Sequence, residues 1–529
     1  MAHNKYLRSL GALGAAGVLT FTLAACGSDS SSDGDVNYVL VNGAEPQNPL
    51  IPADTNENGG GRVVTMLYGT LVYYDADGEV HNEHAESIEL EGEKTYRVTL
   101  KDGLKFSDGS PITAQNYVDT WNNAVAEDLM SAYFFEPILG YEEGAESLEG
   151  LKVVDDHTFT IELAQPESDF PLRLGYSAYA VLPDSAFDDL ESFGENPVSS
   201  GPYVLDEWNH NESITLVPNE NYEGDREAQN DGLRFVLYSN IDAAYADLLA
   251  GNLDVLDAIP DSSFTTYEDE LGDRAVNKPS ALFQSFTIPE TLEHFSGEEG
   301  QLRRQAISLA IDREEITSNI FDGTRTPAHD FSSPTVEGYR DDLAGNEVLE
   351  FDPERAQELW AEADDISEFT GTFSIAYNSD GGHQAWVDAV ANQLRNNLGI
   401  DAEGAPYPDF KSLRDEVTQR TIGSAFRTGW MADYPSVGNF LAPLYATGAS
   451  SNDGDYSNAE FDDLLRQAAG ADSVEKGLEI YGQAQEILLQ DLPAIPLWYS
   501  NTTAGSSEHV DNVAYSWNDA PIYYQITKN

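Results

Sequence analysis

Cysteine and basic residues are both scarce in this 529-residue chain. Its one cysteine is Cys26, so a mature form that begins there has no second thiol for a disulfide. Lys and Arg together number 27 against 93 Asp and Glu, which gives a formal net charge of -66. A surface this acidic repels nucleic acid and anionic lipid headgroups, so we expect no nucleic-acid partner. It is also compatible with a salty medium, where charges are strongly screened.

Motifs for catalysis and cofactor binding are also missing. The chain has no Gly-x-Ser-x-Gly elbow, phosphate-binding loop or dinucleotide fingerprint. His81 and His84 are three residues apart in a Gly-bounded loop, not four apart on a helix as in common zinc motifs. Carboxylate pairs are too numerous to single out one for catalysis. We therefore expect no enzyme activity, no metal and no cofactor. A secreted hydrolase and a surface adhesin remain alternative classes.

The N-terminus predicts export and lipid anchoring. Lys5 and Arg8 precede an uncharged apolar run from 10 to 23, which is typical of a secretory signal peptide and short for a membrane span. Leu-Ala-Ala-Cys-Gly at 23–27 matches a bacterial lipobox, which predicts a signal peptide at 1–25 and lipidation of Cys26. The Ser-, Asp- and Gly-rich residues 28–35 cannot bury a core, so residues 26–35 would form the lipidated Cys and a flexible tether.

The remaining chain of about 500 residues is long enough for two or three domains. Helical and strand patterns alternate along it, which predicts an α/β or α+β fold. Asp352-Pro353 is a typical helix start, and Gly251 and Gly399 are typical helix ends. The patterns predict helices at 113–126, 242–250, 302–311, 384–398, 459–469 and 474–489, a hairpin at 153–163, and strands at 36–41, 95–100, 373–377 and 493–499.

One stretch combines a cation, an aromatic ring and an anion within seven residues. Arg427, Trp430 and Asp433 follow the apolar run 422–426, at a predicted passage from strand to loop. Charges on either side of a Trp could hold the two ends of a zwitterion. A buried Trp with two surface charges on a turn explains the same pattern. His383 similarly fits a surface histidine near a helix start.

Several segments, in order, resemble the oligopeptide- and dipeptide-binding proteins of bacterial ABC importers, the family 5 extracellular solute-binding proteins. The most specific is the run 100–114, Leu-Lys-Asp-Gly-Leu-Lys-Phe-Ser-Asp-Gly-Ser-Pro-Ile-Thr-Ala. The resemblance extends over essentially the whole mature chain through the segments 44–50, 200–203, 306–313, 429–434 and 496–499.

This resemblance implies an α/β, three-lobed clamp of the periplasmic-binding-protein type, in which two lobes close on a ligand. Lobe I would be discontinuous, comprising 36–64, 199–283 and 505–529. Lobe II would comprise 65–198, and lobe III, which closes on the ligand, would comprise 284–504.

The resemblance also assigns site residues. Asp433 would pair with a peptide α-ammonium group, and Arg427 and His383, in Tyr377-Asn378-Ser379-Asp380-Gly381-Gly382-His383, would serve the carboxylate end. Strand edges at Gly429-Trp430-Met431 and Asn42-Gly43-Ala44 would pair with the peptide main chain. The family often has a Trp lining a side-chain pocket in the segment before this strand. Here Tyr407 or Phe410 could take that place.

The implied function is binding of short peptides for uptake. The partners would be the peptide, the ABC permease subunits with their ATPases, and the membrane through the lipid anchor. We expect a monomer, anchored to the outer face of the cell membrane. The same fold could instead bind an oligosaccharide, a nickel chelate, an opine or a polyamine.

Overall fold

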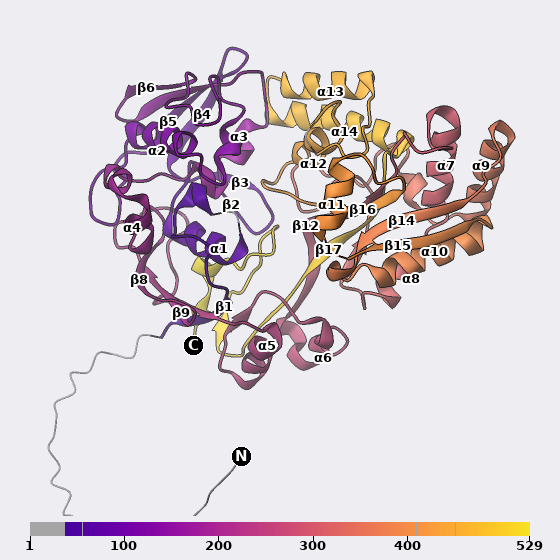
Figure 1. Ribbon diagram of the computed structural model, residues 1–529. Coiled ribbons are helices and arrows are strands. Elements are labelled where there is room, and N and C mark those ends of the chain that lie inside the picture. Colours follow the sequence, from indigo (N-terminus) through magenta and orange to yellow (C-terminus); the bar gives the residue numbers. More distant parts are fainter. Residues whose placement is uncertain (1–36, 56, 409, 450) are drawn as a thin grey trace, which may run out of the picture. The chain divides into compact units, whose positions relative to one another are not determined.

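The computed structural model describes residues 37–55, 57–408, 410–449 and 451–529, and Figure 1 gives the order of their elements. The predicted signal peptide, the lipidated Cys26 and the tether lie outside these residues. The described chain is a mixture of helices and strands, as the alternating patterns predict. Among the described residues, no helix has both the length and the apolar composition that a membrane crossing requires.

A mixed sheet runs through most of the chain in the order β15-β14-β16-β12-β17-β11-β1-β10-β9-β8, with β13 also paired to β17. Its strands are β1 (Val39–Gly43), β8 (Tyr203–Asn209), β9 (Ser213–Pro218), β10 (Leu233–Leu237), β11 (Val255–Leu256), β12 (Ala275–Thr287), β13 (Arg325–Pro327), β14 (Thr372–Asn378), β15 (Asp401–Tyr407), β16 (Ala425–Met431) and β17 (Ala494–Ser506).

Smaller sheets complete the strand inventory. An antiparallel sheet in the order β4-β5-β7-β6 consists of β4 (Ala85–Glu91), β5 (Thr95–Leu100), β6 (Leu151–Asp155) and β7 (Thr158–Glu162). Its last two strands are the hairpin predicted at 153–163. Two pairs of short strands are β2 (Val72–Tyr74) with β3 (Val80–Asn82), and β18 (Val510–Asp511) with β19 (Thr527–Lys528).

The helices begin and end where their capping residues indicate. Thr113 and Asn116 form a capping box at the start of α2, Asp352 caps α9, and Gly399 ends α10 with a φ of 71°. The helices are α1 (Asn58–Leu67), α2 (Ala114–Ala126), α3 (Phe170–Arg173), α4 (Leu190–Glu195), α5 (Ile241–Ala250), α6 (Tyr267–Leu271), α7 (Gly297–Leu309), α8 (Arg313–Asn319), α9 (Pro353–Ile366), α10 (Gln384–Leu398), α11 (Phe410–Thr418), α12 (Gly438–Tyr445), α13 (Ala459–Ala469) and α14 (Val474–Asp491).

Three large apolar clusters hold these elements together. The first core lies around β1, β9 and β10 and includes Val41, Phe235 and Tyr523. The second core lies between the four-stranded sheet and α2 and includes Trp121 and Phe159. The third core is formed by β12, β14 and β17 with the helices that cover them. It brings together residues far apart in sequence, among them Phe283, Phe286, Val387, Leu488 and Trp498.

A buried ion pair joins Glu83, between β3 and β4, to Arg226, in the segment before β10. The Arg226 guanidinium donates from Nε to Glu83 Oε1 at 2.7 Å and from Nη1 to the Thr65 carbonyl at 2.9 Å. Tyr222 and the Thr70 backbone N–H also donate to the Glu83 carboxylate. Burial alone would raise the pKa of Glu83, but Arg226 and these hydrogen bonds outweigh it, and the pKa is lowered.

The first prediction concerns this pair. Arg226→Met leaves the Glu83 carboxylate buried without its cation, so the free energy of unfolding at pH 7 should fall by about 3–5 kcal/mol. The exposed pair Arg355–Glu358 provides the control, because Arg355→Met should cost less than about 1 kcal/mol. Urea denaturation measures both. Equal losses in the two variants would contradict the structural role of the buried pair.

The second prediction concerns net charge. Glu83, Asp169, Asp254 and Asp330 are the buried carboxylates of the described chain, and its other carboxylates reach solvent at least in part. The repulsion among these solvent-accessible carboxylates should weaken as the Debye length falls from about 30 Å at 0.01 M salt to about 3 Å at 1 M. The melting temperature measured by circular dichroism should therefore rise with NaCl. A melting temperature that stays constant or falls over this range would refute the prediction.

Candidate ligand-binding site

Strand β16 has one edge that is only partly paired. β12 pairs with it antiparallel along one side, from Phe426 to Met431. On the other side, β14 pairs with it in parallel at Ala425 and Phe426. Within the described chain, no strand continues this second side from Arg427 to Met431. An extended ligand can add to such an edge through main-chain hydrogen bonds.

Asp433 follows the end of β16 by two residues and is held by the amide of Asn439. Asn439 Oδ1 accepts from the Asp433 backbone N–H at 3.0 Å, and its Nδ2 donates to Asp433 Oδ2 at 3.3 Å. Burial raises the pKa of the Asp433 carboxyl, while Asn439 and Arg173 act in the opposite direction. The charged form is therefore poorly solvated, and a cation brought by a ligand would stabilise it.

The Asp433 carboxyl lines a cavity of about 220 Å³ that we call the tyrosine cavity. Its two arginines are already paired with carboxylates of the protein, Arg62 with Asp257 and Arg226 with Glu83. Its aromatic lining consists of Tyr68, Tyr73, Tyr74, Tyr176, Trp517, Tyr523 and Tyr524. A carboxylate among aromatic rings is a favourable site for an ammonium group, because the ring faces also attract cations.

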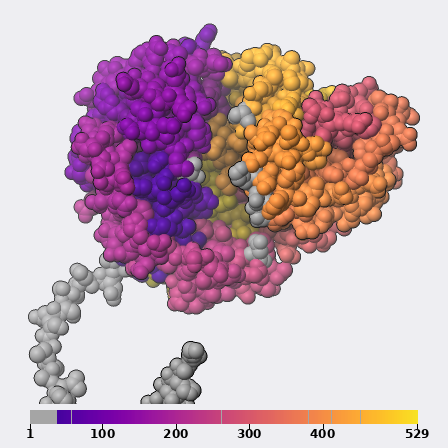
Figure 2. Space-filling model, in the orientation of Figure 1, coloured from indigo at the N-terminus to yellow at the C-terminus, as the bar shows by residue number. Residues whose placement is uncertain are grey.

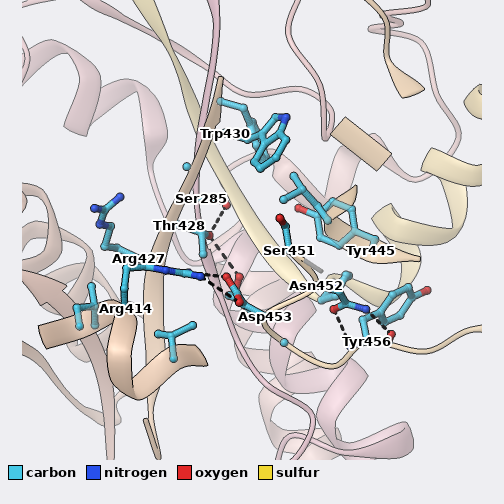
Figure 3. A pocket seen from close by; sticks show the side chains of 18 of the residues that line it. Ser285, Arg414, Arg427, Thr428, Trp430, Tyr445, Ser451, Asn452, Asp453 and Tyr456 are labelled. Carbon is cyan, nitrogen blue, oxygen red and sulfur yellow. Dashed lines mark hydrogen bonds and ion pairs between the residues drawn. The ribbon is translucent and has the colours of Figure 1, made fainter. Parts of the chain in front are cut away.

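A second cavity, of about 210 Å³, lies along the face of the sheet made by β12 and β16 (Figure 3). We call it the hydroxyl cavity, because Ser285, Thr287 and Thr428 line it. Strand alternation places Thr428 and Trp430 on this face, opposite Ser285 and Phe283 of β12. Trp430 Nε1 donates to Asn439 Oδ1 at 3.1 Å, so Asn439 connects the Trp of this cavity to Asp433.

Arg427 and Gly429 also line the hydroxyl cavity. The Arg427 Nε donates to Asn378 Oδ1 at 2.8 Å, and its guanidinium carbon lies 4.9 Å from the centroid of the Phe410 ring. Met431, at the end of the strand, is 42% exposed. Figure 2 shows that the orange part of the chain, around residue 400 on the colour bar, reaches the molecular surface.

His383 and Tyr407 line neither cavity. His383 Nδ1 accepts a hydrogen bond from Trp386 Nε1 at 3.1 Å, on the first turn of α10. The hydroxyl of Tyr407 lies 3.5 Å from Glu416. Of the two aromatic residues considered as a substitute for the family's Trp, Phe410 is the one beside the hydroxyl cavity.

Asn42, Gly43 and Ala44 also lie outside the linings of both cavities. β1 pairs with β10 along its whole length and with β11 at Val41, so one side of Asn42 and Gly43 extends beyond the β11 pairing. The Asn42 side chain is occupied within the protein. Its Oδ1 accepts from the Asp257 backbone N–H at 3.0 Å, and its Nδ2 donates to the Asp257 carboxylate at 2.5 Å.

His81 and His84 do not share a ligand site. His84 is buried, and its Nδ1 is hydrogen-bonded to the Tyr117 hydroxyl at 2.8 Å. Burial lowers the pKa of His84 to about 4, so the ring is neutral at physiological pH. His81 instead contacts Asp75 at 2.9 Å, and both belong with Glu79 to a group whose possible ligand atoms lie within 4.8 Å of one another.

Three parts of the site were not among the sequence predictions. Asn439 lies in α12, and no pattern links it to Trp430 or Asp433. The hydroxyl-bearing residues follow the strand alternation of β12 and β16, which could have indicated a shared polar face. The aromatic residues of the tyrosine cavity come from segments as distant as 68–74 and 517–524, so no local signal could have grouped them.

Comparison with known proteins gives relatives along nearly the whole chain. "Oligopeptide-binding protein OppA" of Bacillus subtilis is 26% identical over 94% of this chain and 95% of its own length. "Probable deoxycholate-binding periplasmic protein YgiS" of Escherichia coli is 29% identical over 85% of each chain. Among solved structures, the unliganded open form of MppA, a periplasmic murein tripeptide binding protein, has a TM-score of 0.82 and 22% identity, covering 93% of this chain and 98% of MppA.

Residues 79–452 match the family described as "Bacterial extracellular solute-binding proteins, family 5 Middle". This match spans more than half of the chain, and the fold agrees with it, including the mixed α/β content and the large mixed sheet. The chain therefore belongs to the family 5 bacterial extracellular solute-binding proteins.

Proposed function

We propose that this protein binds short peptides outside the cytoplasm and delivers them to the permease of an ABC importer. The observation that carries the proposal is the position of Asp433, a poorly solvated carboxylate just beyond the partly open edge of β16. A free peptide supplies both partners that this arrangement lacks, an ammonium group and an extended main chain. Relatives named as an oligopeptide-binding protein and a dipeptide-binding protein support a peptide as the ligand.

In this proposal, the peptide ammonium pairs with Asp433 and the peptide main chain continues along β16 towards Arg427. Five residues of strand, Arg427 to Met431, advance about 13 Å at about 3.3 Å per residue, which corresponds to the main chain of about four peptide residues. Arg427 lies at the far end of this edge, where it can meet a peptide carboxylate. Whether His383 contributes then depends on peptide length.

Lobes I, II and III, with the boundaries predicted from the sequence, would enclose the peptide through a hinge movement. The lipidated Cys26 would anchor the protein to the outer face of the cell membrane. The tether at 28–35 would let the folded part reach the permease, over about 15–17 Å if it behaves as a flexible coil. Closure excludes water, which strengthens the pairing of the ammonium with Asp433.

A second candidate is a non-peptide amine, such as a polyamine. The tyrosine cavity favours it, because aromatic rings beside a carboxylate select for positive charge without requiring a main chain. Competition with spermidine separates the two candidates, whereas N-acetylation removes an ammonium group that both of them require. Acetylated tri-alanine should not bind, because it has no ammonium group. Spermidine should compete with tri-alanine only if the site recognises positive charge without the peptide main chain.

The third prediction tests Asp433. Asp433→Asn keeps the shape of the side chain but removes its charge, so affinity for tri-, tetra- and penta-alanine should fall about 100-fold or more, because the ligand ammonium is left buried without an anion. Isothermal titration calorimetry measures the loss. Exposed Asp341→Asn is the matched control and should bind as the wild type does.

The pH dependence gives an independent check on the same residue. The pKa of Asp433 is raised in the folded protein, so the carboxylate becomes protonated before an ordinary aspartate does as pH falls. Affinity for tri-alanine should therefore decrease on acidification in the wild type and change less in Asp433→Asn. Wild-type affinity in the Asn variant, or the same pH profile for both proteins, would refute the proposed role of Asp433.

A further inference from the structure

Three hydroxyl groups form a hydrogen-bonded row on the wall of the hydroxyl cavity (Figure 3). Ser285 Oγ lies 2.7 Å from Thr428 Oγ1, and Thr287 Oγ1 lies 3.3 Å from the same atom. Thr428 therefore occupies the middle of the row. Ser285 and Thr287 are 2% and 9% exposed, respectively, whereas Thr428 is less completely buried.

Counting donors shows what the row can offer to a ligand. Each hydroxyl has one hydrogen to donate and can accept two hydrogen bonds. Within the described residues, Ser285 and Thr287 have no hydroxyl partner other than Thr428. If both donate to Thr428, its two acceptor positions are filled and its own hydrogen is left for a group in the cavity. The three hydroxyl hydrogens form two hydrogen bonds within the row, so one hydrogen remains available whichever hydroxyls act as donors.

The other walls of the cavity are mostly apolar and aromatic. They include Phe283, Trp430, Leu444, Tyr445, Leu413 and Val417. A dry cavity of about 150 Å³ is known to hold benzene, so about 210 Å³ is enough for a substituted ring. Aromatic side chains also pack favourably against a ligand ring, beyond the area that they bury.

Asp453, a carboxylate in the lining of the cavity, is already paired within the protein. Arg414 Nη1 lies 2.6 Å from Asp453, and Arg420 contacts the same carboxylate at 3.4 Å. A cationic side chain of the ligand would therefore enter a space where Asp453 is already matched. Burying such a charge without its own partner is unfavourable.

From these observations we infer that the hydroxyl cavity is a specificity pocket for a tyrosine side chain of the bound peptide. The inference rests on the proposed peptide-binding function and deepens it. The ring packs between the aromatic and aliphatic walls, and the phenol oxygen accepts the hydrogen of Thr428. The pocket lies on the face of β16 that carries Thr428 and Trp430, beside the edge along which the peptide main chain runs.

Calorimetry with peptides that differ by one oxygen atom tests this inference. The probes are tri- and tetra-alanine with Tyr or Phe substituted at each position in turn, and with Gln as a polar side chain without a ring. At one position, wild-type protein should bind the Tyr peptide about tenfold more tightly than the Phe peptide, because Phe leaves the Thr428 hydrogen without an acceptor.

Variants then assign the preference to the hydroxyl row. Thr428→Val keeps the shape of the side chain and should reduce the Tyr-to-Phe ratio to about one, mainly through weaker Tyr binding. Thr428→Ser retains the hydroxyl and should retain the preference. Thr372→Val removes an exposed hydroxyl from β14 and should change neither affinity.

The outcomes separate this inference from the proposed function. If peptides bind but Tyr and Phe bind equally at every position, or if Gln binds more tightly than Tyr, the tyrosine pocket is refuted while peptide binding stands. If Thr428→Val keeps the wild-type ratio, the hydroxyl row is not its source and the inference also fails. If no peptide of the panel binds to the wild type, the proposed function itself fails.

Discussion

The pairing of β12 with β17 is the interaction on which the rest of the structure depends. These strands run antiparallel from the pair Ala275–Gly505 to the pair Thr287–Ala494. At one end Ala504 belongs to the first core, and at the other Phe286 and Ile495 belong to the third core. The same two strands therefore stabilise both cores and join them through backbone hydrogen bonds.

The geometry of the candidate site depends on the position of β12 in this strand pair. The edge of β12 that faces away from β17 pairs with β16. The register of this pairing determines which side chains of β12 and β16 lie opposite each other on one face of the sheet. Phe283 comes opposite Trp430, and Ser285 comes opposite Thr428. A slip of one residue would move these side chains to the other face and would separate both the hydroxyl row and the Trp430–Asn439–Asp433 connection.

Local elements with strong signals could be predicted from the sequence. The helix at 384–398 and the helix at 459–469 have the predicted boundaries, because capping residues and helical periodicity agree there. β12 could not be recognised in the same way. Pro279 interrupts its pattern, and the register with β17 shifts between Pro279 and Phe283, which is where a strand tolerates proline. The predicted strand at 493–499 is part of the longer β17, whose polar second half gave no clear alternation.

For the site, the sequence provided individual residues but not their relationships. Asp433, Trp430 and Arg427 stood out because unlike side chains lie close together in one short segment. The distances between them could not be derived, and the two cavities combine segments from widely separated parts of the chain. Asn439 shows the reason most clearly, since its role exists only after α12 folds back beside the end of β16.

The central claim is that a ligand ammonium pairs with Asp433 while the ligand main chain extends the edge of β16. A crystal structure of the protein with tri-alanine tests it most directly. The account predicts the peptide nitrogen within about 3 Å of the Asp433 carboxylate and main-chain hydrogen bonds to residues between Arg427 and Met431. A peptide bound elsewhere, or bound in the reverse direction with its carboxylate beside Asp433, would contradict the account.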